Sequence, residues 1–392
     1  MSNSEHLANV FTVVPELDWK QQDGQQLIPP MIEGLVLLVE HMTESSTTTQ
    51  VLDLLSVVID TLEDKIAPYA QHIIATVSRL WAHADQRQML RASILRNLAS
   101  LMSALPNDPN LPQIITHLLP LIDLSTDLSR STDYLILHEE GLNLWFKVLQ
   151  LTAPSSLETP QRDFFTRQLS RVEPIMNNTI EQMTHLAHDT HSRQLKLNKH
   201  SEGYQIPMLF RILHAYLMLG QTPFIELHRE LLVRLFVHGI QHTRKSPKLE
   251  HILLCLTSLM QLLGSQVRVL RLFEPVFVQL YRSLCTQFKD TNGGHMICAV
   301  FARLALLDRE ELLTWLNSQD VTAVAVLYEH WSRAVLDTRE YDVKRTTVLG
   351  LCHVIGTPLG GANIASTIEV VAMGLMDLRD MKSEVVFFEY VY

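Results

Sequence analysis

Three histidines stand at intervals of three residues in the segment HLAHDTH, at His185, His188 and His191, and His200 follows further on. On a helix this spacing brings side chains to one face, where two imidazoles could bind one metal ion. No cysteine or glutamate completes a familiar ligand set, and the surrounding stretch is hydrophilic throughout. A polar helix end that runs into a loop explains these histidines better, so we predict no bound metal.

Other short stretches resemble fragments of catalytic motifs without completing them. The sequence HEE at 138–140 lacks the second histidine of the H-E-x-x-H metalloprotease motif. GGHM at 293–296 and GTPLGG at 356–361 lack the lysine and hydroxyl residue of a phosphate-binding loop. The sequence also shows no cluster of titratable residues of the kind an active site requires. We therefore predict a protein that is not an enzyme and binds no cofactor.

The composition favours a large helical core. Of the 392 residues, 47% are apolar and 19% are charged, which is typical of a folded protein, and leucine is frequent while glycine is scarce. The net charge of −10 argues against binding to DNA or RNA, which depends on neutralising phosphates. An acidic surface suits a basic protein partner, although many acidic proteins have no such partner.

The cysteines and the apolar runs indicate an intracellular protein with no membrane insertion. The cysteines form no C-x-x-C pair and are interpreted as reduced core residues: Cys255, Cys285, Cys298 and Cys352. Residues 1–27 lack the apolar run of a signal peptide, and no stretch reaches the length of a transmembrane helix.

Pairs of amphipathic helices recur along the chain. Pro68 and Pro112 each stand where a first helix begins, and they are 44 residues apart, within the period of HEAT and armadillo repeats. Pro275 opens a later pair in the same way. The expected paired helices are 29–42 with 48–63, 68–84 with 87–105, the helix from Pro112 with 132–151, and the helix from Pro275 with the one that begins at HMICAV.

Further helices are expected between and after these pairs. They cover 161–187, 204–219, 223–242, 248–263, 321–337, 342–355 and 363–378, and the terminal VVFFEYVY is the one credible strand. Four tryptophans fall in helical apolar stripes and are expected to pack in the core: Trp81, Trp145, Trp315 and Trp331.

A single helical hairpin cannot bury its apolar face, whereas stacked hairpins can. We therefore predict an all-α fold, an α-solenoid of HEAT-like helical hairpin repeats with an armadillo-type superhelix. The predicted organisation is a short amino-terminal segment at 1–27, a continuous solenoid at 28–378 and a carboxyl-terminal tail at 379–392.

In such a solenoid, function lies on the exposed faces of the helices. The candidate partner-facing residues on second helices are Arg96, Asn97, Glu140, Asn143 and Lys147. Another candidate group comprises Asp308, Glu310 and Glu311, which could grip a basic partner or simply interact with the dipole at a helix start.

Several segments resemble the importin-β (karyopherin-β) family. They are IAPY followed by an LW pair, QMLRASILRNLASLMSAL, the run from LLPLIDLSTDLS to GLNLW, and LYEHWSRAVLDTREYDVKRTTVLGLCHVI. The resemblance extends over most of residues 28–378 and is less distinct at about 155–265.

The resemblance implies a HEAT-repeat nuclear transport receptor. Such receptors bind protein cargo on the inner wall, contact Phe-Gly nucleoporins and release cargo when Ran·GTP binds, without covalent chemistry. The implied locations are the nucleus and the cytoplasm, with shuttling through the pore and presence at the nuclear envelope.

One departure from the family pattern concerns the amino-terminal repeats. These repeats hold the main Ran-binding surface in the family and have no counterpart here, so the chain is expected to be a fragment, a truncated gene model or a short isoform. The alternative function is that of a HEAT-repeat scaffold or regulatory subunit of another complex.

Overall fold

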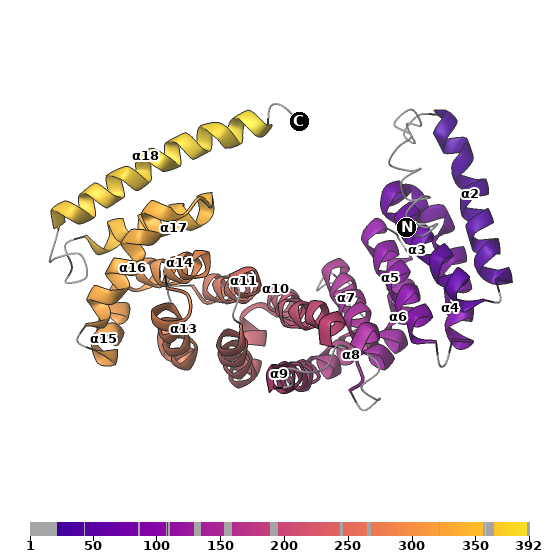
Figure 1. Cartoon of the computed structure of the whole chain (residues 1–392), viewed down its shortest axis with the longest axis horizontal. Coiled ribbons are helices and arrows are strands. Elements are labelled where there is room, and N and C mark those ends of the chain that lie inside the picture. Colours follow the sequence, from indigo (N-terminus) through magenta and orange to yellow (C-terminus); the bar gives the residue numbers. More distant parts are fainter. Residues whose placement is uncertain are drawn as a thin grey trace. The chain divides into compact units, whose positions relative to one another are not determined.

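The computed structural model describes residues 22–42, 44–84, 87–106, 108, 110–128, 135–152, 159–188, 195–243, 246–264, 268–289, 291–320, 322–355, 357 and 364–389. Within these ranges every regular element is a helix (Figure 1). The chain divides into two compact units, Met1–Ala215 and Tyr216–Tyr392. The all-α prediction is therefore confirmed for the part of the chain that the structure describes.

The first unit is built from pairs of helices. Helix α2 packs on α3, α4 on α5 and α6 on α7, and the second helices also pack on one another, α3 on α5 and α5 on α7 (Figure 1). The bounds are Gln22–His41 for α2, Ser45–Leu62 for α3, Ala70–Ala82 for α4, Gln88–Ala104 for α5, Leu111–Ser125 for α6 and Leu135–Leu151 for α7. The second helices begin at residues 45, 88 and 135, so their starts are 43 and 47 residues apart, the spacing of HEAT-like repeats.

Prolines mark several helix starts, as the sequence predicts. Pro112 lies in the first turn of α6, where its missing N–H leaves no intrahelical hydrogen bond unmade. Pro68 differs from the prediction, because it lies in the 3₁₀ helix η1 (Glu63–Tyr69) and α4 begins two residues later. Tight 3₁₀ turns of this kind often lead into an α-helix.

The helix expected at 161–187 is two helices, α8 (Thr159–Leu169) and α9 (Val172–His188). The chain turns between them at Ser170 and Arg171. The signal that the sequence offered is Pro174 in the first turn of α9, in the same Glu-Pro context as Pro275. A proline in that place favours a helix start over a helix interior.

The break expected between 204–219 and 223–242 is present. Helix α10 (Leu195–His242) is interrupted at Gln221, whose φ of 48° and ψ of −144° are not helical. Pro223 stands two residues further on and restricts Thr222, the residue directly before it. Two helices therefore meet at this point, as predicted.

The second unit repeats the paired arrangement. Helix α13 packs on α14 and α16 on α17, while α11, α14 and α17 pack in series (Figure 1). Helix α15 lies between α14 and α16, and α18 packs on α16 and α17. The bounds are Ser246–Leu263 for α11, Val269–Leu272 for α12, Glu274–Thr286 for α13, Asn292–Leu307 for α14, Arg309–Gln319 for α15, Ala323–Asp337 for α16, Tyr341–Val354 for α17 and Ile364–Glu389 for α18.

Gly350 sets the close approach of α17 to its neighbours. A Cβ at this position would lie 2.4 Å from Trp331 Cζ2 and 2.9 Å from the Ala302 Cα. Trp331 is fully buried and donates from Nε1 to the Thr347 carbonyl oxygen at 2.9 Å. Only glycine therefore allows α14, α16 and α17 to meet at this distance.

Hydrogen bonds join side chains on one repeat to the next repeat in both units. In the first unit Gln168 Nε2 donates to Asp123 Oδ1 at 3.2 Å, across 45 residues. In the second unit Gln287 Nε2 donates to the Thr243 carbonyl oxygen at 2.6 Å, across 44 residues. The 44-residue period that separates Pro68 from Pro112 thus recurs as a spacing of contacts.

Three sequence predictions need correction. Residues 385–389 of VVFFEYVY are helical, because α18 continues through them to Glu389, and residues 390–392 lie outside the described ranges. Cys352 is exposed and Cys285 half-buried, whereas Cys255 and Cys298 are buried. Trp81 is half-buried beneath the Arg91 guanidinium, 4.8 Å from its ring centre.

The other predictions about the core and the domains stand as follows. Trp145, Trp315 and Trp331 are buried as predicted. Helices α2 and α18 run across the expected boundaries at residues 27 and 378, and a continuous solenoid over 28–378 stays a prediction.

Candidate partner-binding surface

Helix α5 is enclosed on almost every side. Between residues 90 and 102, only Arg96 and Ser100 are not buried. The reason is that α5 packs on α3, α4 and α7 together. A partner can therefore contact this part of α5 only at Arg96 and Ser100, which we call the open line of α5.

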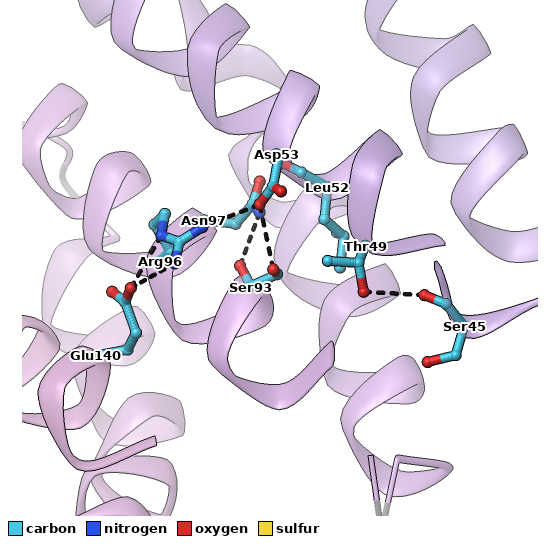
Figure 2. A network of polar contacts seen from close by, with 8 residues as sticks. All are labelled: Ser45, Thr49, Leu52, Asp53, Ser93, Arg96, Asn97 and Glu140. Carbon is cyan, nitrogen blue, oxygen red and sulfur yellow. Dashed lines mark hydrogen bonds and ion pairs between the residues drawn. The ribbon is translucent and has the colours of Figure 1, made fainter. Parts of the chain in front are cut away.

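Arg96 joins the three second helices of the first unit. Its Nε and Nη2 atoms donate to Glu140 Oε1 of α7 at 2.9 and 2.7 Å, and its Nη1 donates to Asp53 Oδ1 of α3 at 3.0 Å (Figure 2). Ser93 Oγ also donates to Asp53 Oδ1, at 3.2 Å. We call Asp53, Arg96 and Glu140 the ladder.

The ladder is partly shielded from solvent, which strengthens the attraction between its opposite charges. The Glu140 side chain is 15% exposed and the Arg96 side chain 42%. Burial on its own would lower the pKa of Arg96, but the charges of Glu140 and Asp53 outweigh it and the pKa is raised. Burial, with a contribution from the charge of Glu140, raises the pKa of the neighbouring Glu139 carboxyl. The ladder thus combines two carboxylates with one guanidinium and carries one net negative charge.

Asn97 is not available to a partner. Although the sequence suggested an exposed residue, the side chain is fully buried. Its Nδ2 donates to the carbonyl oxygens of Leu52 and Ser93, both at 2.9 Å (Figure 2). Asn97 therefore fastens α5 to α3, and the prediction that it is exposed is wrong.

Asn143 and Lys147 extend the ladder along α7. Both are half-buried, and they follow Glu140 by three and seven residues, which puts them on the same side of the helix. Their contact with a partner stays a prediction. Asp53 is the residue that sequence reasoning missed; it stands 43 residues before Arg96, one repeat earlier, and that spacing was the available signal.

The second candidate group lies at the start of α15. Asp308 caps the helix by accepting a hydrogen bond from the Glu311 backbone N–H at 2.9 Å, and Glu310 and Glu311 occupy the first turn. These positions stabilise the helix dipole, as the simpler interpretation predicts. A role in binding a basic partner stays a prediction.

The same three carboxylates line a pocket of 520 Å³ in the second unit, together with Arg268, Leu270, Arg271, Glu274, Thr314, Trp315 and Ser318. Arg271 Nε lies 3.6 Å from Glu311 Oε1, and the Glu311 side chain is only 11% exposed. Burial and the charge of Asp308 raise the pKa of Glu311, and the two arginines oppose the shift. Both charge signs meet in this pocket, so it is not simply an acidic site.

A smaller pocket of 420 Å³ lies between the ends of α3 and α5. Acidic and hydroxyl side chains dominate its lining: Asp60, Glu63, Asp64, Ser100 and Ser103, with Ile59, Ala104 and Pro106. Because Ser100 lies one turn after Arg96, this pocket adjoins the open line of α5.

No group of three or more metal-ligating side chains occurs within the described ranges. The side chains of His185, His188 and His200 and the whole of His191 lie outside what the structure describes. None of the described helices combines the length and apolar character needed to cross a membrane.

Fold and surfaces together define a helical-repeat protein whose candidate sites are exposed helix faces. Residues 197–386 match the family described as importin-11-like, TPR repeats. The chain is 26% identical over 213 residues to importin-11 of Mus musculus, and equally to importin-11 of Homo sapiens. The carboxyl-terminal half of the chain is therefore similar to importin-11-like repeats, and the two importin-11 relatives support a resemblance to the importin-β family.

The aligned region covers 54% of this chain and 19% of each importin-11. The chain thus spans about a fifth of the length of these relatives. Although the family description names TPR repeats, whose period is about 34 residues, the second helices α11, α14 and α17 begin at residues 246, 292 and 341. These starts are 46 and 49 residues apart, which is closer to HEAT spacing.

Proposed function

We propose that the chain is a segment of a nuclear transport receptor that binds protein cargo without covalent chemistry. The observation that supports this proposal is the match of residues 197–386 to importin-11-like repeats. In a receptor of this kind, binding of one ligand changes the affinity for another, and no covalent reaction takes place. Exposed helix faces are sufficient for such binding.

In this proposal, cargo contacts the exposed side of α3, α5 and α7, where the ladder lies. The ladder holds α3, α5 and α7 in register, while Asn143 and Lys147 beside it offer a donor, an acceptor and a positive charge. Phe-Gly nucleoporins are the proposed partners for passage through the pore. Shuttling between nucleus and cytoplasm is the corresponding location.

The test is an affinity capture with the 392-residue chain and a full-length importin-11 side by side. We expect both to retain a shared set of cargo proteins and to bind immobilised Phe-Gly repeats. Ran loaded with a non-hydrolysable GTP analogue is then added to each. Release from the full-length receptor alone places the switch outside these 392 residues.

A matched pair of variants locates the cargo surface. Asn143→Glu adds one negative charge beside the ladder, and Ser78→Glu adds the same charge on an exposed position of α4. We expect at least a tenfold loss of cargo affinity for the first and no change for the second. If the chain captures none of the proteins that importin-11 binds, the proposal fails. If it forms a stoichiometric complex that Ran does not dissociate, the alternative function of a HEAT-repeat scaffold is favoured.

A further inference from the structure

Two pockets adjoin each other in the second unit. The pocket of 520 Å³ lies between the start of α13 and one face of α15, and a pocket of 480 Å³ lies between α10 and the start of α13. They are neighbours because Arg271 lines both. The lining of the 480 Å³ pocket is Arg229, Glu230, Val233, Arg234, Arg271, Leu272 and Pro275.

The 480 Å³ pocket is positively charged, although the whole chain is acidic. Its lining holds three arginines and one glutamate, a net charge of +2, whereas the chain has a net charge of −10. Arg229 is exposed and forms no ion pair within the part of the chain that the structure describes. The Arg271 side chain is 68% exposed, and its distance of 3.6 Å from Glu311 is too long for a hydrogen bond. Guanidinium groups in this state suit the carboxylates of a partner.

The 520 Å³ pocket has the opposite charge. Its lining holds two arginines and four carboxylates, a net charge of −2. Both arginines act on Glu311, whose side chain is 11% exposed. Glu310 pairs with Arg309, which lies outside the lining. Glu274 and Asp308 are exposed and form no ion pair among the described residues, so they are the carboxylates that a basic group of a partner can reach.

Apolar side chains also line both pockets. Leu272 and Pro275 belong to the positive pocket, and Leu270 and Trp315 to the negative one. Trp315 is 5% exposed, and its Nε1 has no hydrogen-bond partner within the described ranges. A buried donor of this kind is uncommon. A partner that occupies both pockets therefore gains apolar contact in addition to its charge pairs.

We propose that the two pockets together bind a bipolar segment of a partner protein, with acidic residues at one end and lysines or arginines at the other. We call the two pockets together the bipolar surface. The acidic residues pair with Arg229 and Arg271, and the basic residues pair with Glu274 and Asp308. A segment of a single charge sign is attracted by one pocket and repelled by the other. The bipolar surface therefore selects the order of charges in its partner rather than the net charge.

The bipolar surface is a second binding surface, separate from the exposed side of α3, α5 and α7. The helices that bound it are α10, α13 and α15, and further helices of the chain precede and follow them. The inference does not depend on the proposed transport function. Capture of cargo and of Phe-Gly repeats tests that function, whereas short charged peptides test the bipolar surface alone.

The experiment measures the binding of fluorescent peptides to the 392-residue chain by anisotropy. The bipolar peptide has a block of glutamates, a short apolar linker and a block of lysines, and the alternating peptide has the same residues in mixed order. We expect the bipolar peptide to bind about tenfold more tightly at low salt, and the difference to shrink at high salt because exposed charges are screened. Peptides with only the acidic or only the basic block should bind more weakly than the bipolar peptide.

Charge reversals locate the two ends of the site. Arg229→Glu should weaken binding of the bipolar peptide about tenfold. Its matched control is Arg282→Glu, because Arg282 is an exposed arginine of α13 that lines neither pocket. Glu274→Lys should also weaken binding, with Glu329→Lys on the exposed side of α16 as its control. A bipolar peptide that binds no more tightly than the alternating one, or that Arg229→Glu leaves unaffected, overturns the proposal.

Discussion

The two units hold their second helices together by different chemistry. In the first unit, α3, α5 and α7 are joined by a polar ladder and by the buried amide of Asn97. In the second, α14 and α17 meet at Gly350 with hydrocarbon on both sides. A polar joint tolerates small displacements because its side chains reorient, whereas a glycine joint fixes the distance between two backbones. The same repeat architecture can therefore be locally adjustable or locally rigid.

The largest effect is expected from a methyl group added at Gly350, where α14 and α17 meet. Gly350→Ala forces Trp331 or the Ala302 backbone to move and should lower the free energy of unfolding of the second unit by about 3 kcal/mol. Hydrogen exchange of the α14 and α17 amides measures the effect in that unit alone.

Gly34→Ala is the matched control, because apart from its chain neighbours and the nearby backbone of its own helix nothing lies within 4 Å of a Cβ at Gly34. Alanine is the better helix former by about 1 kcal/mol, so this variant should be neutral or stabilising. Equal destabilisation by both variants would mean that the close approach at Gly350 is not what holds α14 and α17 together.

Asn97→Ala should have the next largest effect, and on the first unit. It removes two buried hydrogen bonds to the carbonyl oxygens of Leu52 and Ser93 and leaves a small gap, at a cost of about 2 kcal/mol. Protection of α3 and α5 against hydrogen exchange should fall, while that of α14 and α17 stays the same. A loss spread evenly over both units would contradict the assignment of this contact to the first.

Arg96→Met should cost less, about 1 kcal/mol, because the ladder is partly exposed and its charges are screened. Arg96→Lys should recover only part of this loss, since a lysine cannot reproduce the fork of donors that reaches Glu140 and Asp53 together. Urea unfolding at low and high salt measures both effects. If the lysine variant matches the wild-type chain, a point charge is sufficient and the fork has no role.

The smallest expected effect is a loss of folding stability at acidic pH that arises from buried histidines. Burial lowers the pKa of His138, against a hydrogen bond and a charge from Asp127 that raise it, and burial also lowers the pKa of His214. The unfolded chain then binds more protons than the folded one, so stability is lost as pH falls below about 6.5, the usual histidine value. His138→Asn should flatten this loss in the first unit, as followed by thermal unfolding between pH 5 and 7. An unchanged pH dependence would rule out His138 as its source.

Much of this fold could be predicted because helix starts and apolar stripes are local features. Pro112 and Pro275 begin helices as expected, and the break before Pro223 lies where the sequence placed it. The turn at Ser170 and Arg171 was missed because neither residue is a glycine or proline, and Pro174 was not interpreted as marking a helix start. The helix expected at 363–378 is present, but its end at residues 385–389 was taken for a strand because valine and phenylalanine favour strands. The helix that already runs through residues 364–384 overrides that preference.

The candidate surface was less predictable, because burial depends on neighbours that the sequence does not place. Arg96 and Asn97 are adjacent polar residues, and a helix turns them about 100° apart. One reaches the open line between α3 and α7 while the other is fully enclosed. Residue type cannot separate the two cases, but the 43- and 44-residue spacings from Arg96 to Asp53 and Glu140 hold that information once the repeat is known.

The regular spacing of contacts also bears on how the chain acquires its fold. The hydrogen bonds between repeats span 45 residues at Gln168 and 44 at Gln287, so a helix pair meets its partners soon after it is synthesised. Chains rich in such nearby contacts fold quickly, and repeats can nucleate at any point and propagate. We expect each new hairpin to dock as it leaves the ribosome, with the preceding repeat as its template, so that folding keeps pace with translation.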